Sequence, residues 1–407
     1  MPSLFSYILH REPGEAGTVF FRFARNSYLR RAVLLLLVLP VDLLWMALAI
    51  VRAQITHPPA MRTLLLSQFS PGLVARVRQD AVAYIGPPTM AVTAWQNGGL
   101  YIPASPVYVM VAIALLLPAR AREAVGHAAI ALVQCWFRLL RIQQGVLIHH
   151  SDALPFARAC VFAARRQGFS TVCLQHGIFH QHGRITEMDG SHSDINVARS
   201  RLDGALIAAA APQSTLCIEP DFFLLNIRRK ESISSIPTVK LLGEGWHQCD
   251  PAFDKQYLAR LRQLESELVA CGARVIFRPH PCERHLAAAY GFSALETTPL
   301  EESLANADIC VGYSSTVLHE AASLGMASVQ IDVEGAFRPA MTRDDAAPVY
   351  RASSGSQILD SWKNHTAQME ARLSGGKTPE QRHQEAIERV YQTIVQHRTT
   401  PPAGATP

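Results

Sequence analysis

The chain has 407 residues, a formal net charge of +5 and a composition that is 49% hydrophobic and only 17% charged. This length allows two domains with sizeable cores. The mild positive charge suits anionic ligands or an anionic membrane surface, but not nucleic acid. The eight cysteines form no CxxC pair and mostly lie in apolar runs. We therefore expect reduced core thiols in a cytoplasmic protein and no zinc site.

The N-terminal segment, residues 1–57, combines arginines with a long apolar run. Residues 33–51 are apolar except for Asp42, and Pro40 lies among them. This run just reaches the length of a bilayer span, yet a charge near its middle is expensive in lipid and a proline kinks a helix. Three interpretations stay open: an interfacial or monotopic anchor, which we favour, a spanning helix, and a helix buried in a soluble protein.

Strands and helices then alternate through a first unit, for which we predict a domain over residues 58–238. The expected strands are 62–68, 81–85, 146–148, 170–174, 195–198 and 205–209, and the expected helices are 71–78, 107–117, 128–140 and 154–167. Such alternation is typical of a parallel sheet with helices on its faces.

A second alternating unit follows, predicted as a domain over 239–397, and the Thr- and Pro-rich tail 398–407 is expected to be disordered. Its expected strands are 239–242, 274–277, 309–311 and 328–332, and its expected helices are 254–270, 300–306, 315–324, 357–373 and 379–397. The predicted fold class is α/β, with two Rossmann-like domains facing across a cleft after an apolar helical segment. The chain contains neither a Walker-type loop nor a GxGxxG fingerprint.

A turn rich in hydroxyl groups joins the strand 309–311 to the helix that follows it. Ser314, Ser315 and Thr316 supply candidate N-cap hydroxyls after Gly312 and Tyr313 have ended the strand. A strand, a turn and a helix in this order point free backbone N–H groups and the positive end of a helix dipole at one place, which suits a phosphate. A plain capped helix is the alternative.

The preceding strand, 274–277, ends in Arg278-Pro279-His280-Pro281. Ligands of open α/β sheets bind at the carboxyl ends of strands, so Arg278 and His280 would stand beside the serine turn if the two strands are close in the sheet. Arg278 could fork onto phosphate oxygens and His280 could donate to one. Glu320, one turn into the helix, could accept from ribose hydroxyls, or it could simply favour the helix dipole.

Three residues are candidates for the general base. His176 follows a predicted strand and could take a proton from an attacking hydroxyl, or it could only orient its loop. Asp189 and Glu244 lie in acidic turns next to glycine, which are also common turn chemistry. A metal site built from His176, His180 and His182 is disfavoured, because few acidic ligands lie nearby. We therefore predict no metal.

The Arg278–Pro281 element and the Ser314-Ser315-Thr316 turn with Glu320 resemble the HP and serine motifs of bacterial GT-B glycosyltransferases that make surface polysaccharides. The closest likenesses are the sialyltransferase and Kdo-transferase groups, which use CMP-activated sugars. The poly(glycerol phosphate) transferases of teichoic acid synthesis look similar, and Gln175-His176-Gly177 resembles the QHG turn of this wider group. The resemblance covers about residues 145–335. It implies that His280, Ser314 and Ser315 hold the donor phosphate and that Asp189 or Glu244 is the base, although Met188 and Gly243 depart from the family's acidic–acidic–glycine pattern.

The resemblance implies an inverting, metal-independent glycosyltransferase without a cofactor. It would use a nucleotide-activated sugar, with a CMP-sugar favoured, to extend a glycan or lipid-linked acceptor of a capsule or lipopolysaccharide. The protein would be cytoplasmic and peripheral or monotopic at the inner membrane, whose surface is its other partner. The serine turn, Arg278 and His280 would neutralise the departing phosphate in place of a metal. The alternatives are a polyol-phosphate transferase of the teichoic acid type, a UDP-sugar 2-epimerase-like enzyme, and a non-catalytic polysaccharide-assembly scaffold.

Overall fold

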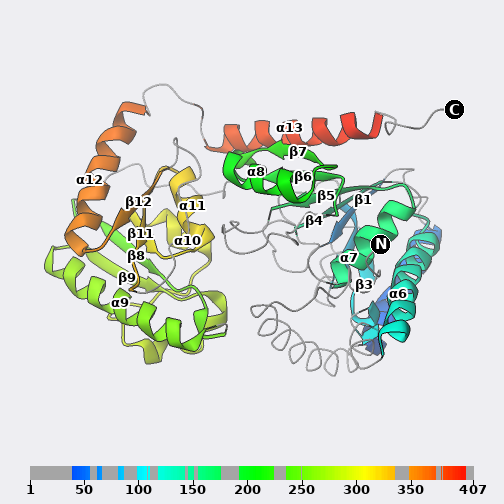
Figure 1. Cartoon of the computed structure of the whole chain (residues 1–407), viewed down its shortest axis with the longest axis horizontal. Helices are drawn as coiled ribbons and strands as arrows, with labels where there is room; N and C mark the ends of the chain where they lie inside the picture. The colour runs from blue at the N-terminus through cyan, green and yellow to red at the C-terminus, as the bar shows by residue number, and fades with distance from the viewer. Residues whose placement is uncertain are drawn as a thin grey trace.

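Two parallel β-sheets organise the part of the chain that the structure describes (Figure 1). The computed structural model describes residues 39–55, 62–66, 81–86, 99–107, 109–110, 118–142, 145–150, 155–175, 192–223, 235–248, 250–334, 348–372, 377 and 379–399. The first sheet has seven strands in the order β3-β2-β1-β4-β5-β6-β7, and the second has five in the order β12-β11-β10-β8-β9. The alternation of apolar strands and helices had predicted this α/β class.

The first sheet is covered by helices on both faces. Its strands are β1 (Arg62–Leu66), β2 (Ala81–Gly86), β3 (Leu100–Pro103), β4 (Gly145–His149), β5 (Ser170–Leu174), β6 (Ile195–Ala198) and β7 (Thr215–Ile218), and its helices include α6 (Ala119–Leu139), α7 (Pro155–Arg166) and α8 (Arg201–Ala210). Leu147 of β4 packs with α6 and α7, whereas its neighbours Val146 and Ile148 belong to the core on the opposite face. This follows from the two-residue period of a strand.

Residues 39–55 are helical and pack on the face of the sheet that α6 and α7 cover. Asp42 is fully buried, and its carboxylate accepts hydrogen bonds from the hydroxyls of Tyr101, at 2.8 Å, and of Ser105. Met46, Ala49 and Ala53 lie in the same core. The outer side of this helix keeps several large apolar side chains exposed, namely Val41, Leu43, Leu44, Leu48, Val51 and Ile55. None of the described helices combines the length and the apolar character needed to cross a membrane.

The second sheet is also sandwiched by helices. Its strands are β8 (Thr238–Leu242), β9 (Arg274–Arg278), β10 (Ile309–Gly312), β11 (Ala327–Ile331) and β12 (Val349–Ala352); the helices are α9 (Pro251–Ala270), α10 (Leu300–Ala305), α11 (Thr316–Ser323) and α12 (Gly355–Arg372). Short 3-10 turns are η1 (Pro220–Phe223), η2 (Trp246–Gln248), η3 (Pro281–Glu283) and η4 (Ala287–Tyr290). α9 and α12 pack on one face, and α10 and α11 on the other. β8 lies between β9 and β10.

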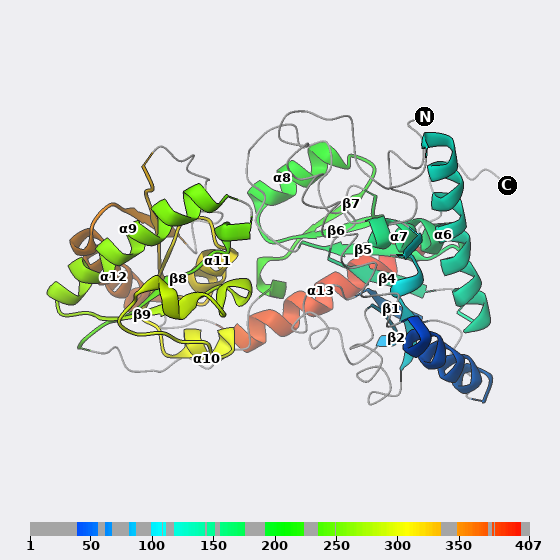
Figure 2. The same cartoon turned by 90° about the horizontal axis from the view of Figure 1, so that it is seen from below.

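The last described helix, α13 (Pro379–Thr399), crosses back to the first sheet (Figures 1 and 2). Its apolar stripe, Ala386, Val390 and Ile394, completes the core beneath β4, β5 and β6. The sequence analysis had grouped this helix with the second unit, because periodicity alone does not tell which sheet an apolar stripe covers.

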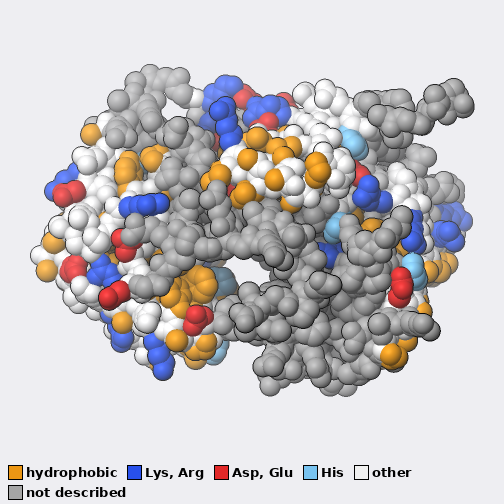
Figure 3. All heavy atoms as spheres, in the orientation of Figure 1, with side chains coloured by type: hydrophobic (Ala, Val, Ile, Leu, Met, Phe, Trp, Pro, Cys, Tyr) orange, Lys and Arg blue, Asp and Glu red, His pale blue; other side chains and the backbone are white. Residues whose placement is uncertain are grey.

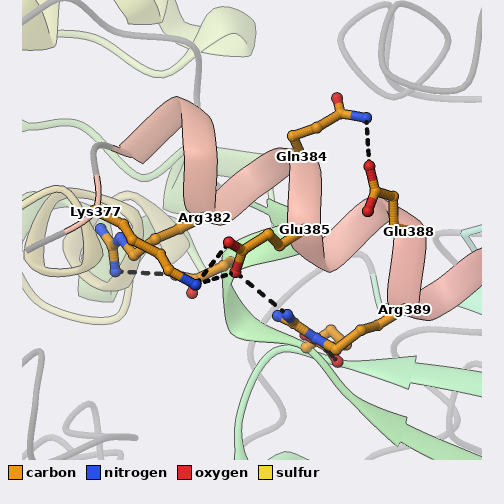
Figure 4. A network of polar contacts seen from close by, with 8 residues as sticks. Lys377, Arg382, Gln384, Glu385, Glu388 and Arg389 are labelled. Atoms are coloured by element: carbon orange, nitrogen blue, oxygen red, sulfur yellow. Dashed lines mark hydrogen bonds and ion pairs between the residues drawn. The ribbon is translucent and has the colours of Figure 1, made fainter.

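A network of charged side chains fixes the first half of α13 (Figure 4). Lys377 contacts Glu385 at 2.6 Å, and Arg389 forms two hydrogen bonds with Glu219 at 2.7 and 2.8 Å. Arg382 donates to Asp221 of η1 and to the carbonyl of Ser323 at the end of α11, so it joins the two units. Charges of both signs accordingly gather on the surface over this part of α13 (Figure 3).

Several expectations need correction or fall outside the described residues. Residues 205–209 were predicted as a strand, but they belong to α8, because Ser200 caps that helix by accepting from the Asp203 N–H and the run that follows is rich in alanine. The strands β3, β7 and β12 were not foreseen. The predicted helix 71–78, most of the predicted helix 107–117 and most of the segment 1–57 lie outside the description. Among the described cysteines, which are free thiols, Cys160, Cys173 and Cys310 are buried.

Candidate functional site

The carboxyl edge of the second sheet is built around Gly243, Glu244 and Gly245, which follow β8, the strand between β9 and β10. This segment runs between the end of β9 and the turn after β10. A Cβ atom on Gly243 would collide with the Glu283 carboxylate and lie 2.9 Å from the backbone nitrogen of His280. Gly245 has a φ of +73°, and a Cβ there would lie 2.7 Å from Cys282 Sγ. Neither position has room for a side chain, so both must be glycine. The left-handed backbone conformation of Gly245 also favours glycine.

Glu244 occupies the position that the serine turn offers to an anion. Its carboxylate accepts from the backbone N–H groups of Tyr313 at 2.6 Å, Ser314 at 2.9 and 3.0 Å and Ser315 at 3.1 Å, and from the Ser314 hydroxyl at 2.7 Å. These donors and the dipole of α11 converge on one point, as the sequence predicted. The anion that they hold in this structure is the chain's own side chain.

Aromatic residues close the other side of this carboxylate. The Trp246 indole donates to Glu244 Oε2 at 3.2 Å, and the Tyr257 hydroxyl lies 3.3 Å from Oε1 while donating to the Leu242 carbonyl at 2.5 Å. Burial, and next the charge of Glu244, raise the pKa of Tyr257 well above its usual value, so this group remains a neutral phenol. As a predicted base, Glu244 would have to leave these contacts before it could take a proton.

Two of the three hydroxyls of the serine turn have assigned roles in the fold. Ser314 binds Glu244, and Ser315 caps α11, since its hydroxyl accepts from the Val317 N–H at 3.2 Å. Thr316 begins the helix, and within the described part of the chain no hydrogen bond engages its N–H or hydroxyl. A further anion could therefore be approached by Thr316 without disturbing the cap.

His280 lies on the opposite side of the Gly243–Gly245 segment, because β8 separates β9 from β10. Its ring Nδ1 faces the Cys282 backbone N–H at 3.4 Å and the Cys282 thiol at 2.8 Å. The backbone N–H of His280 donates to the Glu283 carboxylate. Desolvation of the ring, followed by the charges of His247 and Arg278, lowers the pKa of His280. A neutral imidazole that accepts at Nδ1 carries its proton at Nε2, so that edge can donate to a phosphate.

Arg278 ends β9 as a buried side chain. Its guanidinium donates to the carbonyl of Thr298 at 2.7 Å, and burial lowers its pKa although the charge of Glu296 acts the other way. Glu296 is itself paired with the buried Lys240 at 2.6 Å. Arg278 thus belongs to a charged network inside this unit, beside the segment 296–298.

Glu320 lies at the junction of the two units. Its carboxylate pairs with the Arg199 guanidinium at 2.9 Å, and both side chains are about nine-tenths buried, with exposures of 9% for Arg199 and 12% for Glu320. Arg199 follows β6, donates from its backbone to the Gln175 side chain at 2.7 Å and stacks over Phe223 at 4.4 Å. The sequence analysis did not single out Arg199, although its position after a predicted strand is the same signal that marked Arg278.

The structure thus brings together Glu244, Ser314, Ser315 and Thr316, and it places His280 across the glycine segment and Arg278 in a neighbouring network. Glu320 faces the first unit. His176 and Asp189 lie outside the described residues, although the preceding Gln175 is fixed by Arg199.

Comparison with known sequences finds no match among protein-family models or curated proteins. Solved structures are similar in fold. A UDP-GlcNAc 2-epimerase from Neisseria meningitidis bound to UDP-GlcNAc has a TM-score of 0.51 at 10% identity, over 83% of this chain and 100% of that one. The S. aureus MnaA–UDP structure has 0.51 at 10% identity, over 84% and 98%. A glycosyltransferase from Rickettsia africae is more distant, with a TM-score of 0.47 at 10% identity over 83% of this chain and 100% of that one. The fold is therefore a GT-B-like arrangement of two parallel α/β units.

Proposed function

We propose that the chain is an inverting glycosyltransferase that uses a nucleotide-activated sugar, with a CMP-sugar favoured, to build a surface polysaccharide such as a capsule or lipopolysaccharide. The observation that carries this proposal is the set of fixed N–H donors at the start of α11, which holds a carboxylate at the carboxyl edge of the second sheet. Two structures of similar fold contain UDP and UDP-GlcNAc, and this supports a nucleotide-sugar donor.

The proposed mechanism is an exchange of anions at the serine turn. The donor phosphate takes the N–H groups of Tyr313, Ser314 and Ser315, and Glu244 is released to act as the base. The released carboxylate takes the proton of the acceptor hydroxyl while the new bond to the sugar forms and the bond to the phosphate breaks. The departing charge then rests on the helix N-terminus, with Thr316 as a further donor. His280, across the Gly243–Gly245 segment, is proposed to donate from Nε2–H to another part of the donor.

His176 and Asp189 remain candidate bases on the acceptor side, and Arg278 and Glu320 remain candidate donor-side residues. Glu320 is the more direct of these two, because it reaches from α11 to the first unit through Arg199. In the proposed complex this pair closes one end of the nucleotide site.

Binding to a panel of CMP, UDP and GDP, measured by calorimetry, tests the donor site. We expect binding of one nucleotide class, and we expect Glu244→Ala to bind it more tightly while losing transfer, because the competing internal anion is gone and so is the base. His280→Ala should lose transfer with an unchanged far-UV circular dichroism spectrum. Glu302→Gln, an exposed charge removal on α10, is the matched control. Full transfer by the His280 variant would refute its place in the donor site.

A UDP-sugar 2-epimerase is the second candidate, favoured by the similarity in fold to a UDP-GlcNAc 2-epimerase structure at a TM-score of 0.51, over 83% of this chain and 100% of that one. Incubation with UDP-GlcNAc without any acceptor, followed by product analysis, distinguishes the two: a 2-epimer supports the epimerase, and an unchanged substrate supports the transferase. Donor screening by product mass would reveal polyol-phosphate transfer, and absence of binding to every nucleotide would favour a scaffold.

We also propose that the chain docks at the inner membrane surface through the helix 39–55. Val41, Leu44, Leu48, Val51 and Ile55 recur every three or four residues and are exposed, and the arginine-rich sequence before them suits anionic lipid. Sedimentation with anionic vesicles tests this. Leu44→Glu with Leu48→Glu should abolish binding, whereas Val269→Glu, at an exposed position of α9, should not. Equal binding by both variants would contradict the proposal.

A further inference from the structure

A compact group of potential metal ligands lies beside the candidate donor site, on the side of His280. His247, Asp254 and Glu283 each offer one ligand atom, and these atoms all lie within 4.8 Å of one another. The three residues come from η2, from the first turns of α9 and from η3, so the chain folds three separate segments around this point. Glu283 is 1% exposed and Asp254 is 6% exposed.

Several polar atoms of this group are buried without a hydrogen-bond partner. They are Oδ1 of Asp254, Nδ1 of His247 and the hydroxyl of Tyr290 on the adjoining η4. Buried polar groups in native proteins are almost always satisfied, and an orphaned set that converges on one place indicates a missing partner. Asp254 is only 6% exposed, so an unpartnered oxygen on this carboxylate is costly and favours a ligand at this place.

The charges at this place also favour a cation. The Glu283 carboxylate accepts from the N–H groups of Gly245 and His280, and each of its oxygens keeps a further lone pair. The Asp254 and Glu283 carboxylates are held away from solvent close to one imidazole, and within the described residues no Lys or Arg forms an ion pair with them.

We propose that His247, Asp254 and Glu283 bind one divalent transition-metal ion of the Zn²⁺ or Mn²⁺ class. One imidazole with two carboxylates suits these ions better than Mg²⁺, which prefers oxygen ligands and retains its waters. Ligands about 2.0–2.2 Å from one zinc ion are at most about 4.4 Å apart, so the widest pair closes by a few tenths of an ångström. The ion would clamp η2, α9 and η3 and thereby hold Gly245 and the His280 loop in place.

This role is structural, and it stands independently of the proposed function. The glycosyl transfer proposed above needs no metal at the donor phosphate. The clamp instead fixes the two loops that flank Glu244, as metal binding that joins separate segments contributes to folding stability.

Full-length protein without a histidine tag, stripped with a chelator, is titrated with ZnCl₂, MnCl₂ and MgCl₂ by calorimetry. Metal content and thermal unfolding are measured in parallel. We expect one equivalent of Zn²⁺ or Mn²⁺ with a midpoint raised by several degrees, and at least tenfold weaker binding of Mg²⁺. Absence of stoichiometric binding of both transition metals would overturn the proposal.

Variants then locate the site. Asp254→Asn and His247→Gln should each weaken binding at least tenfold, and both should change the visible spectrum of the Co²⁺-loaded protein. His285→Gln, whose ring lies 6.3 Å from that of His247, and Glu302→Gln should bind as the wild type does. Equal loss in the controls, or unchanged binding in both ligand variants, would contradict the assignment. His247 is only half-buried on a short turn, so its variant tests the site even if Asp254→Asn fails to fold.

Discussion

Two carboxylates, the fully buried Asp42 in the first unit and the half-buried Glu244 in the second, are held in different ways. Glu244 accepts from three backbone N–H groups whose positions are set by β10 and α11. Asp42 accepts mainly from two hydroxyls, those of Tyr101 and Ser105, and the backbone of Ser105 adds a weaker contribution. Burial raises the pKa of Asp42 despite these bonds, and burial followed by the charge of Asp42 raises the pKa of Tyr101.

The difference lies in what each set of donors can do when the carboxylate is removed. A hydroxyl can rotate and can also accept, so Tyr101 and Ser105 can reorganise around a neutral side chain. Backbone N–H groups at a helix N-terminus are fixed, cannot accept, and face the positive end of the helix dipole. The serine turn therefore requires an acceptor, and preferably an anion, at all times, which is the property that a donor phosphate could exploit.

The largest effect should come from filling the space next to Glu244. Gly243→Ala places a methyl group against the Glu283 carboxylate and 2.9–3.0 Å from the backbone of His280 and Pro279. Because backbone atoms yield little, we expect a loss of about 3 kcal/mol in the free energy of unfolding of the second unit. Urea unfolding measures it.

Gly272→Ala is the control for that variant. Gly272 has a φ of +84° and open space around its Cβ position, so alanine there costs only the left-handed conformation, about 1–2 kcal/mol. An equal loss in the two variants would show that the backbone beside Glu244 can move, and it would remove the crowding that distinguishes this region from the surroundings of Asp42.

The sequence predicted the α/β class and the convergence of backbone N–H groups at the serine turn, because strand periodicity and N-cap chemistry are local signals. It did not predict that β8 separates β9 from β10, since strand order is set by long-range packing. For the same reason it did not predict that Glu244 itself fills the turn. The acidic residue between two glycines was recognised, but its partner lies 69 positions away in the chain, at Tyr313.

A smaller effect is expected when Glu244 keeps its shape but loses its charge. Glu244→Gln replaces one acceptor oxygen by an NH₂ group that faces the fixed N–H donors, so we expect a loss of about 2 kcal/mol. Glu244→Ala should be stabilised by inorganic phosphate more than the wild type is, relative to chloride at equal ionic strength, because phosphate can replace the carboxylate. Thermal unfolding in the two salts measures both. If phosphate stabilised the alanine variant and the wild type equally, the proposed anion exchange would be wrong.

The smallest effect should be that of Asp42→Asn, which keeps an acceptor for Tyr101 and Ser105. We expect the stability at pH 7 to change by less than about 1 kcal/mol, or to rise, since no buried charge remains. The pH dependence is more telling. Because the folded-state pKa of Asp42 is raised above 3.8, its contribution to stability is fully present below pH 3.8 and is lost as the pH rises through the folded-state value.

The asparagine variant cannot ionise, so it should lack this loss, and its advantage over the wild type should grow as the pH rises from 4 towards 7, by about 1.4 kcal/mol per unit of pKa elevation. Urea unfolding at several pH values measures the difference between the two proteins, in which other ionising groups cancel. Asp360→Asn, at an exposed position of α12, should run parallel to the wild type. If the free energy of unfolding of Asp42→Asn also followed that of the wild type at every pH, Asp42 would ionise in the folded protein at no cost. Its hydroxyl donors would then hold a charge as well as the helix N-terminus holds that of Glu244.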